Sequence, residues 1–242
     1  MAEKKLTRPQ MPAQRGPNCG LYALTAAARA LDPTQYAELY ATKGDHTGVR
    51  SGSAPQSLRY TAKRLAHGTG NATQIGEIFS ASAMVALAQA IGLQARAVSN
   101  PAAWTPLIKT AIDAGRYMLA PFGVSDSGEP QATGNRPHWC IVYGYKETWF
   151  GQNIAYVVHW GRSFEFGTSD LRKSSKALKT FRETWEKTHK PLKFVKAGTS
   201  RVAVHAGGIG GVAYQAIAVP PQFNFDADLP TMLAGQLVEV WK

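Results

Sequence analysis

The chain has 242 residues, of which 44% are hydrophobic and 18% are charged, and its formal net charge at pH 7 is +11. This is enough apolar material for the core of one large domain. No apolar run approaches the ~18 residues that a membrane span needs, and no apolar stretch follows the basic N-terminus, so we expect neither membrane association nor an ordinary secretory signal. Two cysteines do not make a disulfide framework, which favours a cytoplasmic location or export without a classical signal peptide.

The first half of the chain is predicted to be mainly helical. Residues 1–13 are rich in Lys, Arg and Pro and are predicted to form a flexible basic arm ahead of a single domain over 14–242. Apolar residues at helical spacing predict helices over residues 19–31, 55–67, 80–91 and 104–114. Short apolar runs predict strands over residues 93–98 and 117–122.

The second half is predicted to be mainly β-structure. A Gly-, Pro- and Asp-containing segment over 123–137 is predicted to be a mobile surface loop. Thr168 or Ser169 is predicted to cap a basic helix that runs to about His189. Apolar runs predict strands over residues 139–145, 154–160, 163–166, 202–205 and 214–219. Helices that come first and antiparallel strands that come later indicate an α+β domain.

Positive charge is concentrated in one stretch of the sequence. Residues 162–201 contain eleven Lys and Arg against four acidic residues, which gives +7 of the total +11. Such a stretch is typical of a solvated helix face, or of a surface that attracts an acidic partner or nucleic acid. The sequence has no zinc-finger spacing, aromatic RNP pattern or helix-turn-helix, which argues against nucleic acid as the partner.

Cys19 is the strongest candidate for a catalytic residue. It is predicted to stand in the first turn of helix 19–31, where the helix dipole and free backbone N–H groups stabilise a thiolate. Gly16 and Gly20 would leave room for a substrate carbonyl, and the Gln14 amide with the backbone N–H of Cys19 would form an oxyanion hole. A buried structural cysteine is the alternative, but it does not account for this clustering.

A thiolate nucleophile needs a base, and His138 is the best candidate. It follows the predicted loop and opens strand 139–145, which would place its imidazole at the edge of a sheet. His159, at the end of the next strand, is the competing candidate. Cys140 shares a strand face with His138, but a zinc site built from these two and Cys19 would lack a fourth ligand. Cys140 is therefore predicted to be a core residue, and no metal or cofactor is expected.

These residues carry a family resemblance. QRGPNCGLYAL, followed over a hundred residues later by PHWCIVYGY, resembles the Q–x4–C … H pattern of papain-like peptidases of the C39-like group. With VVHWGRSFEFGTSDLRKSS, it is most similar to the actin maturation proteases, eukaryotic enzymes that trim the N-termini of actins. The resemblance implies a papain-like catalytic domain whose nucleophile helix packs on an antiparallel sheet. It also implies Cys19 as nucleophile, His138 as base, Gln14 as oxyanion donor, and a protein or peptide as substrate.

The residue that orients His138 is left open by the sequence. A C39-type peptidase would show Asp-Pro at the end of the neighbouring strand, where this chain has His159-Trp-Gly. Asn153, Asp170 and Gln152 are the other candidates, although Asn153 lies at the wrong end if the strands are antiparallel neighbours. A Cys–His dyad without a third member is a further alternative.

The bond that such a site would cleave is also open. A cysteine peptidase is the first hypothesis, and the basic stretch would suit an acidic substrate. A papain-like glutamine deamidase or amidase, or a transglutaminase-type bacterial effector toxin, would use the same Cys19 and His138. A non-enzymatic binding module is the third hypothesis, against which the complete Gln–Cys–His set argues.

Overall fold

The computed structural model of the chain describes residues 2–14, 18–41, 56–58, 61–62, 78, 80–100, 102–134, 136–178, 202–208, 211–217 and 233–242. Its helices are α1 (Cys19–Leu31), α3 (Ala81–Ala90), α4 (Thr105–Asp113) and α5 (Thr168–Lys176). The strands are β1 (Glu3–Lys5), β2 (Leu39–Tyr40), β3 (Gln56–Ser57), β4 (Gln94–Ser99), β5 (Tyr117–Gly123), β6 (Pro137–Glu147), β7 (Asn153–His159), β8 (Arg162–Gly167), β9 (Val202–Gly208), β10 (Gly211–Ile217) and β11 (Gln236–Trp241).

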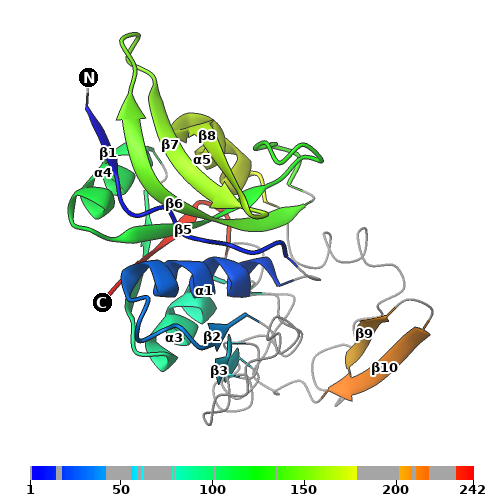
Figure 1. Ribbon diagram of the computed structural model, residues 1–242. Coiled ribbons are helices and arrows are strands. Elements are labelled where there is room, and N and C mark those ends of the chain that lie inside the picture. The colour runs from blue at the N-terminus through cyan, green and yellow to red at the C-terminus, as the bar shows by residue number, and fades with distance from the viewer. Residues whose placement is uncertain are drawn as a thin grey trace.

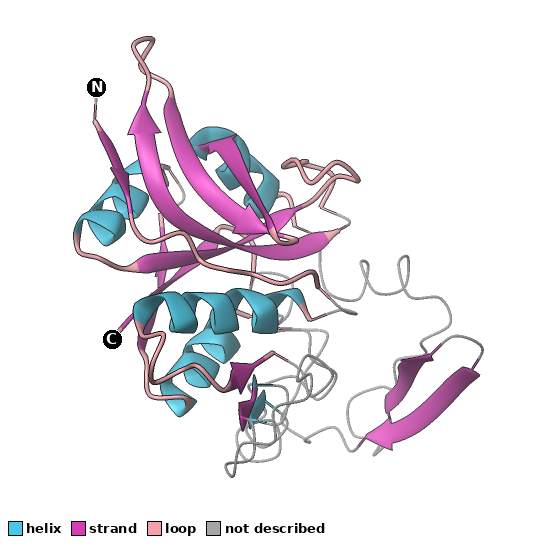
Figure 2. Cartoon of the chain, in the orientation of Figure 1, coloured by secondary structure: helices cyan, strands magenta, loops and turns pink. Residues whose placement is uncertain are grey.

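An antiparallel sheet lies at the centre of the molecule, with helices on both of its faces (Figures 1 and 2). Its strands run in the order β4-β11-β5-β6-β7-β8, and β1 also pairs with β6. Helices α1 and α3 cover one face, and α4 and α5 cover the other. The predicted α+β class, with the helix of Cys19 packed on an antiparallel sheet, is confirmed.

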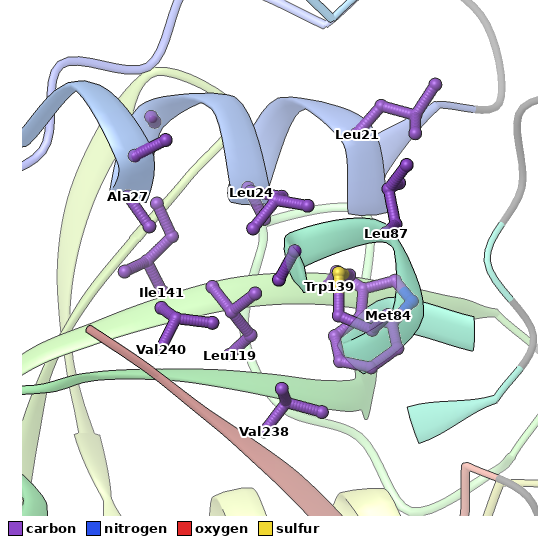
Figure 3. Packing of buried hydrophobic residues seen from close by; sticks show 14 of the residues in the cluster. Leu21, Leu24, Ala27, Met84, Leu87, Leu119, Trp139, Ile141, Val238 and Val240 are labelled. Carbon is purple, nitrogen blue, oxygen red and sulfur yellow. The ribbon is translucent and has the colours of Figure 1, made fainter. Parts of the chain in front are cut away.

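The core follows from the alternation of side chains along the sheet strands. Leu119, Trp139, Ile141 and Val240 face α1 and α3 (Figure 3). Alternate residues of the same strands face the other way and meet α4 and α5, as Phe122, Cys140, Val142 and Leu237 do. Because the side-chain period of a strand is two, this assignment also fixes the face on which each residue of the site lies.

Most predicted elements of the described segments are confirmed to within one or two residues, which is the usual uncertainty of element ends. Most of the predicted helix 55–67 lies outside the described residues, and its first residues form β3, parallel to β2. Helix α5 ends at Lys176, and the N–H of Leu178 bonds the carbonyl of Ser175. Residues 179–189 of the predicted basic helix lie outside the described residues. Gly167, and not Thr168 or Ser169, is its N-cap.

The C-terminal strand β11 is absent from the sequence prediction, although it lies inside the sheet between β4 and β5. It is antiparallel to both neighbours. A central strand usually reads as a continuous apolar run, but QLVEVW is interrupted by Glu239. The carboxylate of Glu239 is 3% exposed and pairs with Arg96 and Arg116 at 2.9 and 3.0 Å.

The predicted flexible arm is wrong for its first residues, which form β1. Strand β5 pairs with β6 only as far as Val142, and β1 then takes its place beside β6 from Gly144 to Lys146. The charged side chains of β1 are satisfied at the surface: Lys5 pairs with Glu3 at 2.9 Å and lies over the ring of Tyr156. Backbone hydrogen bonds to β6, and not burial of apolar side chains, hold this segment. Composition does not show such backbone pairing, and it therefore predicts flexibility here.

A glycine at position 144 is needed for this pairing, and Gly144→Ala is expected to weaken it. An added Cβ would lie 2.6 Å from the carbonyl oxygen of Lys4. We expect the substitution to lower the free energy of unfolding by about 1–3 kcal/mol, the usual cost of overpacking. Urea denaturation measures this cost, and a matched chain that lacks residues 1–5 provides the control. An equal cost in the shortened chain would show that the clash with β1 is not its cause.

Candidate active site

Cys19 is the first residue of α1 and is partly exposed. The helix begins after Asn18, whose carbonyl accepts the N–H of Tyr22 at 3.0 Å, and its first turn contains no acidic residue. The N–H groups and the dipole at this end of a 13-residue helix therefore act on Cys19 without a competing negative charge in the turn. This is an environment that favours the thiolate.

Ile78 joins the surroundings of Cys19 to those of His138. An added Cβ at Gly20 would lie 2.9 Å from Cγ1 of Ile78, so the glycine lets Ile78 pack against the first turn of α1. The backbone carbonyl of Ile78 accepts a buried hydrogen bond from the indole of Trp139 at 2.8 Å. Gly20 and Trp139, the sequence neighbours of the two predicted catalytic residues, therefore both lie against Ile78. The space at Gly20 is filled by this packing, which corrects its predicted role of making room for substrate.

The segment that carries Gln14 passes the turn between β7 and β8. A Cβ at Gly161, in that turn, would lie 3.2 Å from the carbonyl oxygen of Met11 and 3.8 Å from the nitrogen of Ala13. Nearby, Arg8 donates to the hydroxyl of Ser163. Gln14 therefore follows a stretch that is held against this turn and precedes α1. Gly16 lies outside the described residues.

His138 is the second residue of β6 and lies opposite Phe122 of β5. The N-terminal end of α1 and the beginning of β6 lie at the same end of the molecule (Figure 1). Because Trp139 faces α1, the ring of His138 faces the other side of the sheet. Cys19 packs against the cluster on the α1 side, so the two residues flank the beginning of β6 from its two faces.

The imidazole of His138 is nearly enclosed by other rings. It is 5% exposed, and its ring centroid lies 5.1 Å from that of His159, 5.2 Å from that of Trp160 and 5.7 Å from that of Phe122. Its Nε2 is buried without a hydrogen-bond partner among the described residues. Burial, and then the neighbouring His159, lower the pKa of His138 well below its usual range, so the ring is neutral near pH 7.

Of the candidates for the residue that orients His138, His159 is the one that lies beside it. It ends β7, is fully buried, and stacks on Phe164 of β8 with a centroid distance of 4.3 Å. Burial lowers its pKa to about 4. Gly128, in the loop between β5 and β6, covers His159. A Cβ at Gly128 would lie 3.3 Å from Cε1 of His159.

The loop over 123–137, predicted to be mobile, is held in place on the sheet. The buried hydroxyl of Ser174 accepts the N–H of Gly123 and donates to the carbonyls of Gly123 and Gln131. Gln131 in turn donates its backbone N–H to the carbonyl of Gly123 at 2.8 Å. Polar composition predicts a surface position here but does not show this bonding, which fixes the loop over the site.

Asn153 and Asp170 lie away from the histidines. Asn153 begins β7 and pairs with Glu147, six residues from His159, which is about 20 Å along a strand. Asp170 lies in the first turn of α5 and lines, with Asn153, a cavity of about 450 Å³ at that far end. Both are therefore excluded as partners of His138, and the antiparallel pairing of β6 and β7 is the reason.

Cys140 is fully buried, and its Sγ donates to the carbonyl of Ala120 at 3.4 Å. Burial raises the pKa of its thiol well above the usual value, and the neighbouring Cys19 adds to that rise. The two cysteines thus differ sharply: one stands partly exposed at a helix N-terminus, and the other is an inert core thiol.

Sequence reasoning missed the residues that close the site. Nothing in the sequence points to Ile78 as a link between α1 and β6. The alternation of Phe164 and Phe166 in β8 was a usable signal, since residues two apart share a strand face and both rings contact His159. Trp160, with a φ of 48°, turns the chain directly after His159 and places its own ring against both histidines.

No three His, Cys, Asp or Glu side chains among the described residues come together as ligands of a metal ion would. None of the helices in that part of the chain has the length and apolar character that a membrane span requires.

Comparison with known proteins adds to this geometry. Residues 10–146 match the family described as actin maturation protease-like, C-terminal domain. A crystal structure of a presumed C39-like peptidase from Bacillus anthracis aligns with 72% of this chain and 92% of that chain, with a TM-score of 0.42 and 10% sequence identity. A search of the curated proteins found no match. The family match includes Gln14, Cys19 and His138 and ends before His159.

Proposed function

Because this chain belongs to the actin maturation protease-like family, we propose that it is a papain-like cysteine peptidase that hydrolyses peptide bonds. The observation that supports the proposal is the arrangement of α1 and β6, which begin at the same end of the molecule. Cys19 is the partly exposed first residue of α1, and His138 is the buried second residue of β6.

In the proposed reaction, the sulfur of Cys19 attacks the carbonyl carbon of the scissile bond and its proton passes to His138. The amide of Gln14 and the backbone N–H of Cys19 hold the oxyanion that forms. His138 then gives the proton to the departing amine, which leaves a thioester on Cys19. Water, deprotonated by the same ring, hydrolyses the thioester and releases the acid.

The ring nitrogen that serves Cys19 in this proposal is Nδ1. The other nitrogen of His138, Nε2, is buried among the rings of the far side of the sheet. A histidine that acts as a base uses one nitrogen for the proton it takes, and the other is held by its surroundings. Substrate would reach the site from the end of the sheet at which α1 begins.

An acidic peptide is the proposed substrate class. The net charge of +11 draws acidic chains toward the protein, and the family's name refers to actin, whose N-terminal segments are acidic. Much of the basic stretch lies outside the described residues. A glutamine deamidase or amidase is the second candidate, because the same nucleophile and base would attack a side-chain amide as readily as a backbone one.

The proposal is tested on the full chain with peptide substrates. Acidic actin N-terminal peptides and a peptide library of mixed composition are incubated with the protein, and the products are identified by mass spectrometry. We expect new fragments with free amino termini, and faster cleavage of acidic peptides at low salt than at high salt. Conversion of glutamine to glutamate in unbroken peptides would favour the deamidase instead. Recovery of every peptide unchanged would contradict both.

A further inference from the structure

Three buried ring nitrogens, Nε2 of His138 and both nitrogens of His159, make no hydrogen bond of regular geometry with the described residues. The backbone of Gly128 offers His159 a hydrogen bond that raises its pKa against the larger, opposite effect of burial. Unsatisfied buried polar atoms are uncommon and often mark a functional site. Here all three belong to two rings whose centroids are 5.1 Å apart, with planes inclined by 67°. A centroid separation of 5.1 Å allows a nitrogen of one ring to lie within hydrogen-bonding distance of a nitrogen of the other when both nitrogens lie along the line between the rings.

Aromatic rings form the described surroundings of the two histidines. His159 contacts the rings of Phe122 from β5, Phe164 and Phe166 from β8, and Trp160 from the turn. His138 contacts Phe122 and Trp160 in the same way. Among the described residues, the groups that influence the pKa values of the pair are the two histidines and the backbone of Gly128.

We propose that His159 is the positioning residue of His138, and that it acts as a neutral ring where a carboxylate would otherwise stand. This inference rests on the proposed function. The Nε2–H of His138 donates to a ring nitrogen of His159, which fixes the tautomer that leaves the lone pair on Nδ1 for the Cys19 thiol. His159 neither gains nor loses a proton in the reaction.

The chemical consequence is a resting site without an ion pair. A carboxylate beside a histidine stabilises the imidazolium and thereby a thiolate next to it. A neutral imidazole that is buried among aromatic rings supplies no such charge. Burial also opposes the protonation of both histidine rings. Cys19 therefore has no imidazolium partner in the resting site, and in this proposal its proton moves to His138 during attack. His138 would become protonated only as the pH falls below its lowered pKa.

Alkylation of the full chain by iodoacetamide tests this without a substrate, because the reagent reacts with thiolate. The rate of mass gain is measured from pH 5 to pH 9 for the wild type, His159→Asp and His159→Asn. We expect the wild type and His159→Asn to share one profile, with a single rise at alkaline pH. His159→Asp should raise the pKa of His138 by about 1–3 units and increase the alkylation rate of Cys19 at pH 6 by about tenfold or more.

Two controls separate positioning from folding. Cys140 is fully buried, so its alkylation reports an unfolded variant within the same measurement. The gain in His159→Asp should vanish when His138→Gln is added, because the charge acts through His138. A folded His159→Asp variant with the wild-type profile, or a gain that survives His138→Gln, would overturn the inference. Absence of peptide cleavage by the wild type would instead contradict the proposed function and leave this pH profile to be judged on its own.

Discussion

Cleavage of peptides is expected to be lost in Cys19→Ala and retained in Cys140→Ala. The loss should be roughly 10⁴-fold or more, because removal of a covalent nucleophile leaves only binding and the oxyanion donors. Cys140 is a buried thiol with a strongly raised pKa, and its replacement removes one small core side chain. That change should cost about 1 kcal/mol of stability and leave the rate per folded molecule nearly unchanged.

The comparison is made as initial rates on the peptide cleaved fastest by the wild type, with each variant checked for cooperative unfolding. Labelling by a thiol-directed covalent inhibitor, located by mass spectrometry of the digested protein, identifies the reacting residue. Labelling on Cys140 in the folded wild type, or cleavage that survives Cys19→Ala, would show that the nucleophile has been assigned to the wrong residue.

The sequence was sufficient for those elements whose signal is local. Helix α1 shows an apolar stripe that begins directly at Cys19, and the strand after His138 shows a dense apolar run, so both predicted catalytic residues could be placed at the ends of elements. The same holds for β7, whose end at His159 was predicted to within one residue. In each case the hydrophobic period of a single segment carries the information.

What the sequence could not provide was the pairing between distant segments. His159 and Asn153 are both on β7, and only the register with β6 shows which of them lies beside His138. That register contains an irregularity between Val142 and Gly144, where the chain also exchanges β5 for β1 as a neighbour of β6. A shift of this kind has no local signature in the sequence beyond the glycine itself.

The buried charge of Glu239 is the reason that the sequence did not predict β11. A strand with a central glutamate contradicts the usual composition of a buried strand, and its partners lie more than a hundred residues away at Arg96 and Arg116. Only the completed sheet shows that β4 and the residue before β5 supply the two guanidinium groups. The C-terminal strand is therefore specified partly by ion pairing, which patterning of apolar residues does not detect.

Removal of both arginines around Glu239 is expected to destabilise the fold by about 3–5 kcal/mol, because a carboxylate that is 3% exposed would lose its charged partners. Arg96 binds both carboxylate oxygens, and Arg116 binds one of them at 3.0 Å. The variant Arg96→Ala with Arg116→Ala is compared with the wild type by urea denaturation, from which the free energy of unfolding is obtained.

The matched control is Lys109→Ala with Lys146→Ala, which removes two lysines whose partners Glu147 and Glu165 are 36% and 54% exposed. Water can solvate those carboxylates, so each pair should contribute no more than about 1 kcal/mol. Adding Glu239→Leu to the arginine double variant should restore part of the lost stability, since an apolar side chain needs no partner inside the sheet. Equal losses in the two double variants would show that burial of Glu239 does not make the fold depend on its arginines.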